Sequence, residues 1–159
     1  MTLAIRPATR DDVPVILRFV RELAAFEREP DAVEATEAML DRALFDERAA
    51  EAMIAERDGV PVGFALFFHN FSTWTGKKGL YLEDLYVTPE ARGSGVGTAL
   101  LRHLAALAIE RDCGRFEWSV LDWNQPAIDF YTAMGAEMMA EWRIERVAGK
   151  ALVRLAERG

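Results

Sequence analysis

The stretch "ARGSGVGTALL", residues 91–101, decides how the rest of the sequence is interpreted, because three alternating glycines follow Arg92 and precede an apolar run. Glycine adopts left-handed backbone conformations readily and lets backbone N–H groups come close to a ligand. The stretch therefore fits either a loop that binds an anion or an ordinary glycine-rich turn, and taken alone it favours neither.

Spacing excludes two common nucleotide-binding motifs. The dinucleotide motif G-x-G-x-x-G, started from either of the first two glycines, needs glycine where the chain has Thr98 or Leu100. A Walker loop needs Gly-Lys-Ser/Thr, but no lysine lies between residues 79 and 149. The pattern R-x-x-G-x-G remains, with Arg92, Gly95 and Gly97. Its backbone N–H groups, the following helix N-terminus and the arginine together suit a pyrophosphate.

The elements on either side predict an α/β domain. Apolar periodicity and turn residues indicate strands at 3–6, 52–56, 61–69, 80–87 and 115–121, helices at 11–26, 36–45, about 96–113 and 125–134, and a last hairpin formed by 141–147 and 150–156. The helical crossover between 88 and 114 predicts that the strands before and after it are parallel. We expect one domain over residues 1–159, with a mixed sheet of about seven strands covered by about four helices.

Composition limits the function. The 159 residues carry a net charge of −7, which disfavours nucleic acid as a partner. The apolar runs are shorter than the roughly 20 residues of a membrane span, and the N-terminus lacks the pattern of a signal peptide. The single cysteine, Cys113, fits a cytoplasmic protein, and with no histidine near it in sequence it does not suggest a nucleophile. His69 and His103 have no metal-ligand spacing, so we expect no metal.

Three blocks carry a family resemblance. "LYLEDLYV" (80–87), "TPEARGSGVGTALL" (88–101) and "WNQPAIDFYTAMGA" (123–136) resemble the GNAT superfamily of acyl-CoA-dependent N-acetyltransferases. "IRPAT" (5–9), "LAAFE" (23–27) and "WTGKKG" (74–79) extend the likeness to the diamine (spermidine/spermine) acetyltransferase branch. The resemblance implies a GNAT fold, acetyl-CoA as cosubstrate and a homodimer.

The resemblance also implies which residues meet coenzyme A. The glycine loop would hold the pyrophosphate through Arg92, Gly93, Ser94, Gly95, Val96, Gly97 and Thr98. The preceding strand would offer backbone groups to the pantetheine arm at Leu85, Tyr86 and Val87. Asn124, which is also placed to cap a helix, would contact the cofactor together with Pro126 and Tyr131.

The resemblance also implies that two side chains take part in the reaction. Acetyl transfer to an amine requires loss of a proton from the amine and departure of a thiolate. Glu83 would contact the amine, directly or through water, and Tyr131 would donate a proton to the leaving sulfur. Adjacent strand residues face opposite sides, so we expect Asp84 to point away from Glu83. The alternatives are an ordinary surface acid and an ordinary packed tyrosine.

The acceptor pocket is implied by matching positions in the diamine branch. The candidate substrate-binding residues are Phe26, Glu27, Trp74, Glu83, Trp118 and Ser119. Ser72, however, stands where polyamine-acetylating relatives carry an acid. The acceptor is therefore left open among a diamine, a polyamine and a lysine-like amino acid such as thialysine.

The predicted function is transfer of an acetyl group from acetyl-CoA to a primary amine, by direct attack in a ternary complex. The expected partners are a small-molecule amine and a second copy of the chain, with no nucleic acid or membrane. Two alternatives stay open: an acetyltransferase acting on a protein amine, and a non-catalytic sensor that binds acyl-CoA.

Overall fold

A computed structural model describes residues 2–157 of the chain. The residues form two compact units, Met1–Leu121 and Asp122–Gly159, which we describe separately. Within the described range, no helix has both the length and the apolar character that crossing a membrane demands. The single domain over 1–159 stays a prediction.

The first unit is built on a mixed five-stranded sheet in the order β1-β2-β3-β4-β5. Its strands are β1 (Leu3–Pro7), β2 (Glu51–Arg57), β3 (Val60–Ser72), β4 (Lys77–Val87) and β5 (Phe116–Trp118). Neighbouring strands are antiparallel except β4 and β5, which are parallel. The predicted parallel crossover is therefore confirmed, and the strand after it is shorter than expected.

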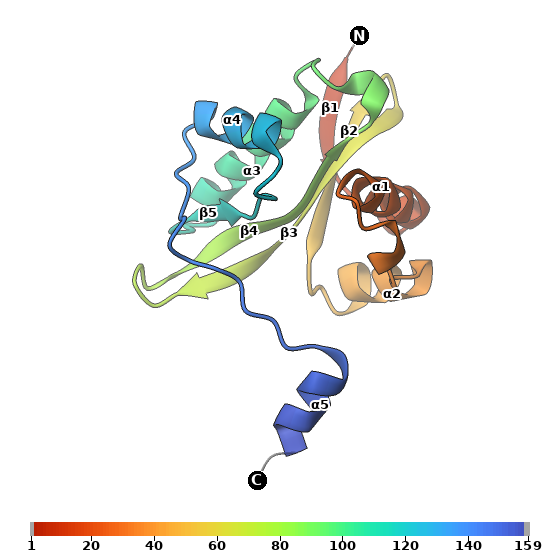
Figure 1. Cartoon of the computed structure of the whole chain (residues 1–159). Coiled ribbons are helices and arrows are strands. Elements are labelled where there is room, and N and C mark those ends of the chain that lie inside the picture. Colours follow the sequence, from red (N-terminus) through yellow and green to blue (C-terminus); the bar gives the residue numbers. More distant parts are fainter. Residues whose placement is uncertain (1, 158–159) are drawn as a thin grey trace. The chain divides into compact units, whose positions relative to one another are not determined.

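Helices cover both faces of this sheet. Helices α1 (Val13–Phe26) and α2 (Glu37–Asp41) lie on one face and α3 (Val96–Glu110) on the other (Figure 1). Short turns of other helix types add η1 (Arg10–Asp12), η2 (Pro30–Ala32), η3 (Arg42–Asp46) and η4 (Pro89–Ala91). On the α1 face the ring of Phe19 packs 5.8 Å from that of Phe64 and 5.5 Å from that of Tyr86. This core fixes α1 against β3 and β4.

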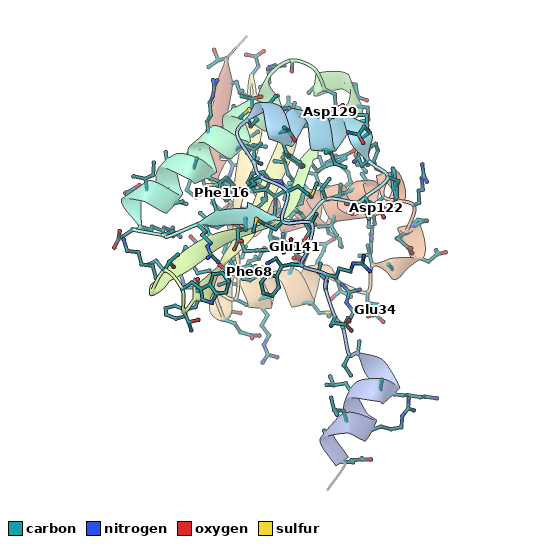
Figure 2. The ribbon with its side chains drawn as sticks, turned by 60° about the vertical axis from the view of Figure 1, so that its left-hand side comes forward. Glu34, Phe68, Phe116, Asp122, Asp129 and Glu141 are labelled. Atoms are coloured by element: carbon teal, nitrogen blue, oxygen red, sulfur yellow. The ribbon has the colours of Figure 1, made fainter. Side chains whose placement is uncertain are left out.

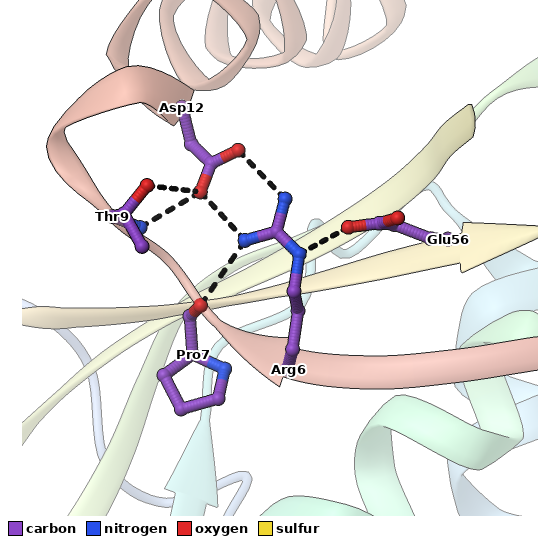
Figure 3. Close-up of polar contacts among 5 residues, drawn as sticks. All are labelled: Arg6, Pro7, Thr9, Asp12 and Glu56. Carbon is purple, nitrogen blue, oxygen red and sulfur yellow. Dashed lines mark hydrogen bonds and ion pairs between the residues drawn. The ribbon is translucent and has the colours of Figure 1, made fainter. Parts of the chain in front are cut away.

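A charged clamp joins β1 to the start of α1 (Figure 3). The guanidinium of Arg6 donates two hydrogen bonds to the carboxylate of Asp12, at 2.7 and 2.8 Å, and also pairs with Glu56 on β2. Asp12 is only 7% exposed and accepts a further bond from the backbone N–H of Thr9 at 2.7 Å. The Arg6 guanidinium, the largest influence, and this backbone bond hold the pKa of Asp12 below its usual range. The "IRPAT" block therefore has a structural role.

The second unit contains α4 (Gln125–Ala133) and α5 (Gly149–Glu157). The predicted hairpin of 141–147 and 150–156 is wrong, and the described residues 2–157 form five strands and five α-helices rather than seven and four. Residues 150–157 are mostly Ala, Leu, Lys, Arg and Glu, which favour helix, and the turn before them lacks an Asn-Gly or Asp-Gly pair. Local propensity therefore prevails over the alternation that predicted strands.

Candidate active site

The glycine loop forms a cradle of backbone N–H groups between η4 and α3. Gly93 and Gly95 have φ angles of +76° and +90°, in the left-handed region that favours glycine. Within residues 2–157, the amides of Gly93, Ser94 and Gly95 have no hydrogen-bond acceptor. The first turn of α3, which begins at Val96, adds the free N–H groups of a helix start.

The cradle fits a phosphate group. A Cβ atom added at Gly93 or Gly95 would meet no other atom within 4 Å, so the space above the loop is open. Free amides together with the positive end of a helix dipole make such a loop an anion site. The backbone geometry has the features that an anion site requires, and the binding of an anion by this loop stays a prediction.

The cradle lies at the end of an open strand edge. Strands β4 and β5 pair at only three positions, Leu80, Tyr81 and Leu82 of β4 with residues 116–118. Beyond Leu82, no strand of the described sheet pairs with β4 on that edge, although β3 continues to pair on the other up to Val87. The segment 83–87, which includes the expected Leu85, Tyr86 and Val87, therefore has no paired strand on one edge, although the carbonyl oxygen of Val87 already accepts a hydrogen bond from Arg92.

The side chain of Arg92 does not point into the cradle. Its Nε donates a hydrogen bond to the carbonyl oxygen of Val87 at 3.0 Å. Its guanidinium lies 5.2 Å from the ring centre of Phe26 and 5.6 Å from that of Tyr86. The arginine therefore links the loop to the C-terminal end of α1, and its charge is held on the α1 face of β4.

A β-bulge in β4 lies at its two adjacent acids, Glu83 and Asp84, and changes the face on which the following residues lie. Asp84 pairs with Leu66 of β3, whereas Leu82 pairs with the next residue, Phe67, so Glu83 is the extra residue in the ladder. Cross-strand partners share a face, which puts Leu82 on the α3 face and Asp84 on the α1 face. The expectation that Asp84 points away from Glu83 is therefore wrong, because the bulge breaks the alternation on which it rested.

Three carboxylates gather where α1 ends beside β4. Burial, and then repulsion from Glu83 and Glu27, raises the pKa of Asp84 to about 6. Burial and the charge of Glu83 likewise raise the pKa of Glu27. Among residues 2–157, no arginine, lysine or histidine forms an ion pair with any of the three. The acidic cluster, Glu27, Glu83 and Asp84, is thus an uncompensated negative site, and Asp84 is the member that sequence reasoning missed.

Two further expected residues lie beside this edge. Trp118 pairs with Leu82, one residue before the bulge, and its ring packs 4.9 Å from that of Phe116 on β5. The hydroxyl of Ser119 is 2.7 Å from that of Tyr81, whose ring lies against that of Phe68 on β3. Both are therefore close to β4, on the strand side opposite β3.

Trp74 and Ser72 lie elsewhere in the unit. Trp74 is 79% exposed at the tip of the β3–β4 hairpin, with the guanidinium of Arg115 5.8 Å from its ring. Lys77 and Asp84 lie seven positions apart along β4, which is about 23 Å at 3.3 Å per residue. The hydroxyl of Ser72 accepts hydrogen bonds from the amides of residues 74 and 75, so it caps the hairpin turn. Neither residue lies in the acidic cluster of its own chain.

The remaining expected residues belong to the second unit. Asn124 caps α4, and its side-chain oxygen accepts a hydrogen bond from the amide of Ala127 at 3.3 Å. Pro126 lies in the first turn, and Asp129 on the same helix accepts a bond from Gln125 (Figure 2). The ring of Tyr131 is partly exposed and lies 5.5 Å from that of Phe130. The predicted cap is confirmed.

A second polar cluster lies at the far end of α3. Arg111 makes two hydrogen bonds to Glu51, at 2.7 and 2.9 Å, and one of 2.9 Å to Nε2 of His69. His69 Nδ1 is 3.0 Å from the carbonyl oxygen of Gly79 and 3.9 Å from the sulfur of Cys113. A histidine distant in sequence therefore does lie near Cys113 in the fold, which the sequence did not indicate. Both ring nitrogens already have partners, so the histidine joins strands to α3 rather than activating the thiol.

The described residues contain no group of three or more histidine, cysteine, aspartate or glutamate side chains arranged to hold a metal ion.

Comparison with known proteins identifies the family. The profile of the acetyltransferase (GNAT) family matches residues 17–136. The chain is 38% identical over 167 residues to the thialysine N-epsilon-acetyltransferase of Sus scrofa, an alignment that covers 98% of each protein. It is 39% identical over 163 residues to the spermidine/spermine N(1)-acetyltransferase-like protein 1 of Homo sapiens, covering 96% of this chain and 23% of that protein.

A solved structure has a closely similar fold. An integron cassette protein from the mobile metagenome of V. cholerae superposes with a TM-score of 0.82 at 28% identity, over 99% of both chains. The predicted resemblance to the GNAT superfamily and its spermidine/spermine branch is thus confirmed. Since the profile covers most of its length, the chain belongs to the acetyltransferase (GNAT) family and is an N-acetyltransferase.

Proposed function

We propose that the protein transfers an acetyl group from acetyl-CoA to a primary amine of a small diamine, polyamine or lysine-like amino acid. The observation that carries this proposal is the acidic cluster, because three carboxylates with no basic partner match a substrate that bears ammonium groups. The cluster lies at one end of the open edge of β4, and the amide cradle lies at the other.

The chain offers a place for each part of acetyl-CoA. The amides of residues 93–98 would hold the pyrophosphate, and the open backbone edge at 85–87 would bond the pantetheine arm. When bound, acetyl-CoA supplies the acetyl thioester. A backbone N–H of residues 85–87 would polarise the thioester carbonyl, since a fixed donor stabilises the developing negative charge. Asn124 and Pro126 at the start of α4 are assigned to the same ligand.

The acidic cluster would bind and deprotonate the acceptor. A primary ammonium has a pKa of about 10, so a base must remove its proton before the nitrogen can attack. Glu83, the exposed residue of the bulge, is assigned this proton, directly or through water. Asp84 and Glu27 hold the positive charge close to it. The attack is direct, in a ternary complex, with no covalent bond to the enzyme.

Tyr131 is assigned as the donor of a proton to the departing thiolate. A phenol hydroxyl carries a proton that can be donated to a sulfur leaving group, or can stabilise it by a hydrogen bond. We expect the Tyr131→Phe variant to lose kcat at least tenfold while its dissociation constant for coenzyme A changes less than threefold. Near-normal turnover in that variant would contradict the assignment.

Ser72 favours a lysine-like amino acid over a polyamine among the candidate acceptors. The position carries no charge, and its hydroxyl is used in the hairpin turn. One anionic contact expected for a polyamine is therefore missing, whereas a relative of similar length acts, by its name, on thialysine. Introducing the acid with Ser72→Asp is expected to lower the KM for spermidine relative to that for thialysine.

We further propose a cytoplasmic homodimer in which Trp74 serves the acceptor site of the partner subunit. The hairpin tip is about 23 Å from the acidic cluster of its own chain along β4. It exposes Phe71 and Trp74, at 67% and 79%, and large exposed apolar side chains often mark an interface. Sedimentation at micromolar concentration tests the dimer. Trp74→Ala should raise the acceptor KM without changing the dissociation constant for coenzyme A.

An acceptor screen tests the proposed function. Thiol release from acetyl-CoA would be measured with thialysine, lysine, ornithine, putrescine, spermidine and a lysine-containing peptide. We expect turnover with at least one small amine and its loss in Glu83→Gln. Turnover with the peptide alone would favour a protein acceptor instead. Tight coenzyme A binding without turnover on any amine would favour the sensor alternative.

A further inference from the structure

The amide cradle lacks the cation that its motif was expected to supply. Arg92 is bonded to the carbonyl oxygen of Val87 and lies against the rings of Phe26 and Tyr86, so its charge is directed toward α1. Arg111, the arginine just past the end of α3, is bound to Glu51. Coenzyme A carries a diphosphate and a 3′-phosphate, and this chain has a net charge of −7. The negatively charged protein and the phosphates of coenzyme A repel each other, and neutral amides alone do not compensate this repulsion.

Another arginine reaches the loop from a different strand. Arg57 is the last residue of β2, and its guanidinium donates a hydrogen bond to the hydroxyl of Ser94 at 3.0 Å. Ser94 in turn donates to the carbonyl oxygen of Ala91, so the hydroxyl proton is engaged and its oxygen is free to accept from Arg57. The contact joins the β2–β3 hairpin to the centre of the cradle.

The charge of Arg57 is not neutralised within the protein. Among residues 2–157, no carboxylate lies within ion-pair distance of its guanidinium. A guanidinium has five N–H donors, of which the bond to Ser94 uses one. Arg57 is partly exposed and loop residues 92–95 are exposed, so the remaining donors are accessible to a ligand. A partly satisfied arginine beside free amides is the usual composition of a phosphate site.

We propose that Arg57 is a phosphate-binding residue for coenzyme A and supplies the cationic contact at the glycine loop, while the side chain of Arg92 links the loop to α1. This inference rests on the proposed use of acetyl-CoA. Two phosphate groups have the required chemistry, the diphosphate over the amides and the 3′-phosphate of the ribose. Both are recognised by the same charge-assisted hydrogen bonds.

Binding measurements on the full chain test the proposal without turnover. Titration calorimetry would compare the parent, Arg57→Gln and Arg57→Lys with coenzyme A, 3′-dephospho-coenzyme A and pantetheine. We expect Arg57→Gln to weaken coenzyme A binding about tenfold or more, as for loss of a charged hydrogen bond. Arg57→Lys should recover part of this loss, and pantetheine, which has no phosphate, should bind all variants alike.

The ligands distinguish the two phosphates. An equal loss with dephospho-coenzyme A would assign Arg57 to the diphosphate, and a loss confined to coenzyme A would assign it to the 3′-phosphate. Either result supports the proposal. The matched control is Arg42→Gln, which removes the same charge from an exposed residue on η3 paired with Glu47. It should bind coenzyme A as the parent does.

Two results would overturn the proposal. The first is coenzyme A binding by Arg57→Gln within twofold of the parent, which leaves the proposed function intact. The second is an equal loss in Ser94→Ala, because Arg57 would then act only by ordering the loop through that hydroxyl. Failure of the parent itself to bind coenzyme A would reject the proposed function, and the inference with it.

Discussion

Replacing Asp84 with asparagine tests whether ionisation of this carboxyl group controls use of the acceptor. Burial, then Glu83, then Glu27 raise its pKa from 3.8 to about 6. A group with that pKa is about 9% ionised at pH 5 and about 91% ionised at pH 7. If the ionised form holds the ammonium, kcat/KM of the parent gains about tenfold over this interval from Asp84 alone, whereas Asp84→Asn gains nothing from that source.

The assay compares parent and variant at each pH. Initial rates of thiol release would be measured from pH 5 to 8 with saturating acetyl-CoA and the best acceptor from the screen. The amine and the other ionising groups titrate in both proteins, so the ratio of the two kcat/KM values isolates Asp84. We expect this ratio to rise about tenfold between pH 5 and pH 7.

Two further variants make the test specific. Glu27→Gln removes one repelling charge, so the pKa of Asp84 should fall and the rise in rate should move to lower pH. Glu110→Gln removes an exposed acid from α3 and should leave the profile unchanged. A parent-to-variant ratio that stays constant within twofold from pH 5 to 7 would refute the role of Asp84.

Three other perturbations follow from the structure. Asp12→Asn breaks the clamp with Arg6 and should cost about 2 kcal/mol, or roughly 4–8 °C in Tm at pH 7. The folded-state pKa of Asp12 is lowered, so its contribution is complete above the unfolded pKa of about 4 and is lost as pH falls from there through the lowered folded pKa; the difference between the two Tm values should therefore shrink as the pH is lowered. Gly95→Ala forces alanine to φ +90° and puts a methyl group in the cradle, so calorimetry should find coenzyme A binding at least tenfold weaker. Glu51→Gln should lower Tm by a few degrees and leave that binding unchanged, because its partner Arg111 is structural.

The order of elements in the first unit could be predicted because local signals agree there. The Asp58-Gly59 turn sets the β2–β3 hairpin, with both residues at positive φ, and the crossover from 88 to 114 requires parallel strands. The loop was also predictable, since only glycine adopts the left-handed conformation of Gly93 and Gly95 without strain. What spacing could not supply was the direction of Arg92, because the rings that hold it come from α1 and β4.

The prediction of a C-terminal hairpin was wrong because the local signals disagree there. The segment 141–147 alternates apolar and polar residues through Trp142 and Ile144, which predicts a strand. A strand also needs a partner to satisfy its backbone, and 150–156 was the partner assumed. Those residues form α5 instead, where Leu152 and Leu155 lie three positions apart, as on one side of a helix. Without that partner, residues 141–147 have no neighbouring strand with which to form the backbone hydrogen bonds of a hairpin.

The acidic cluster shows where a sequence signal was present but was interpreted with the wrong period. In "LYLEDLYV", strict alternation would group Leu80, Leu82 and Asp84 on one face, burying a carboxylate against α3. Moving the phase by one residue at Glu83 places four aliphatic side chains on the α3 face, namely Leu80, Leu82, Leu85 and Val87. The apolar residues thus favour the bulge energetically, and the bulge brings Asp84 to the same side as Glu27. In this chain the slip in aliphatic spacing next to Glu83 and Asp84 was therefore the sequence signal for the bulge at the acidic cluster.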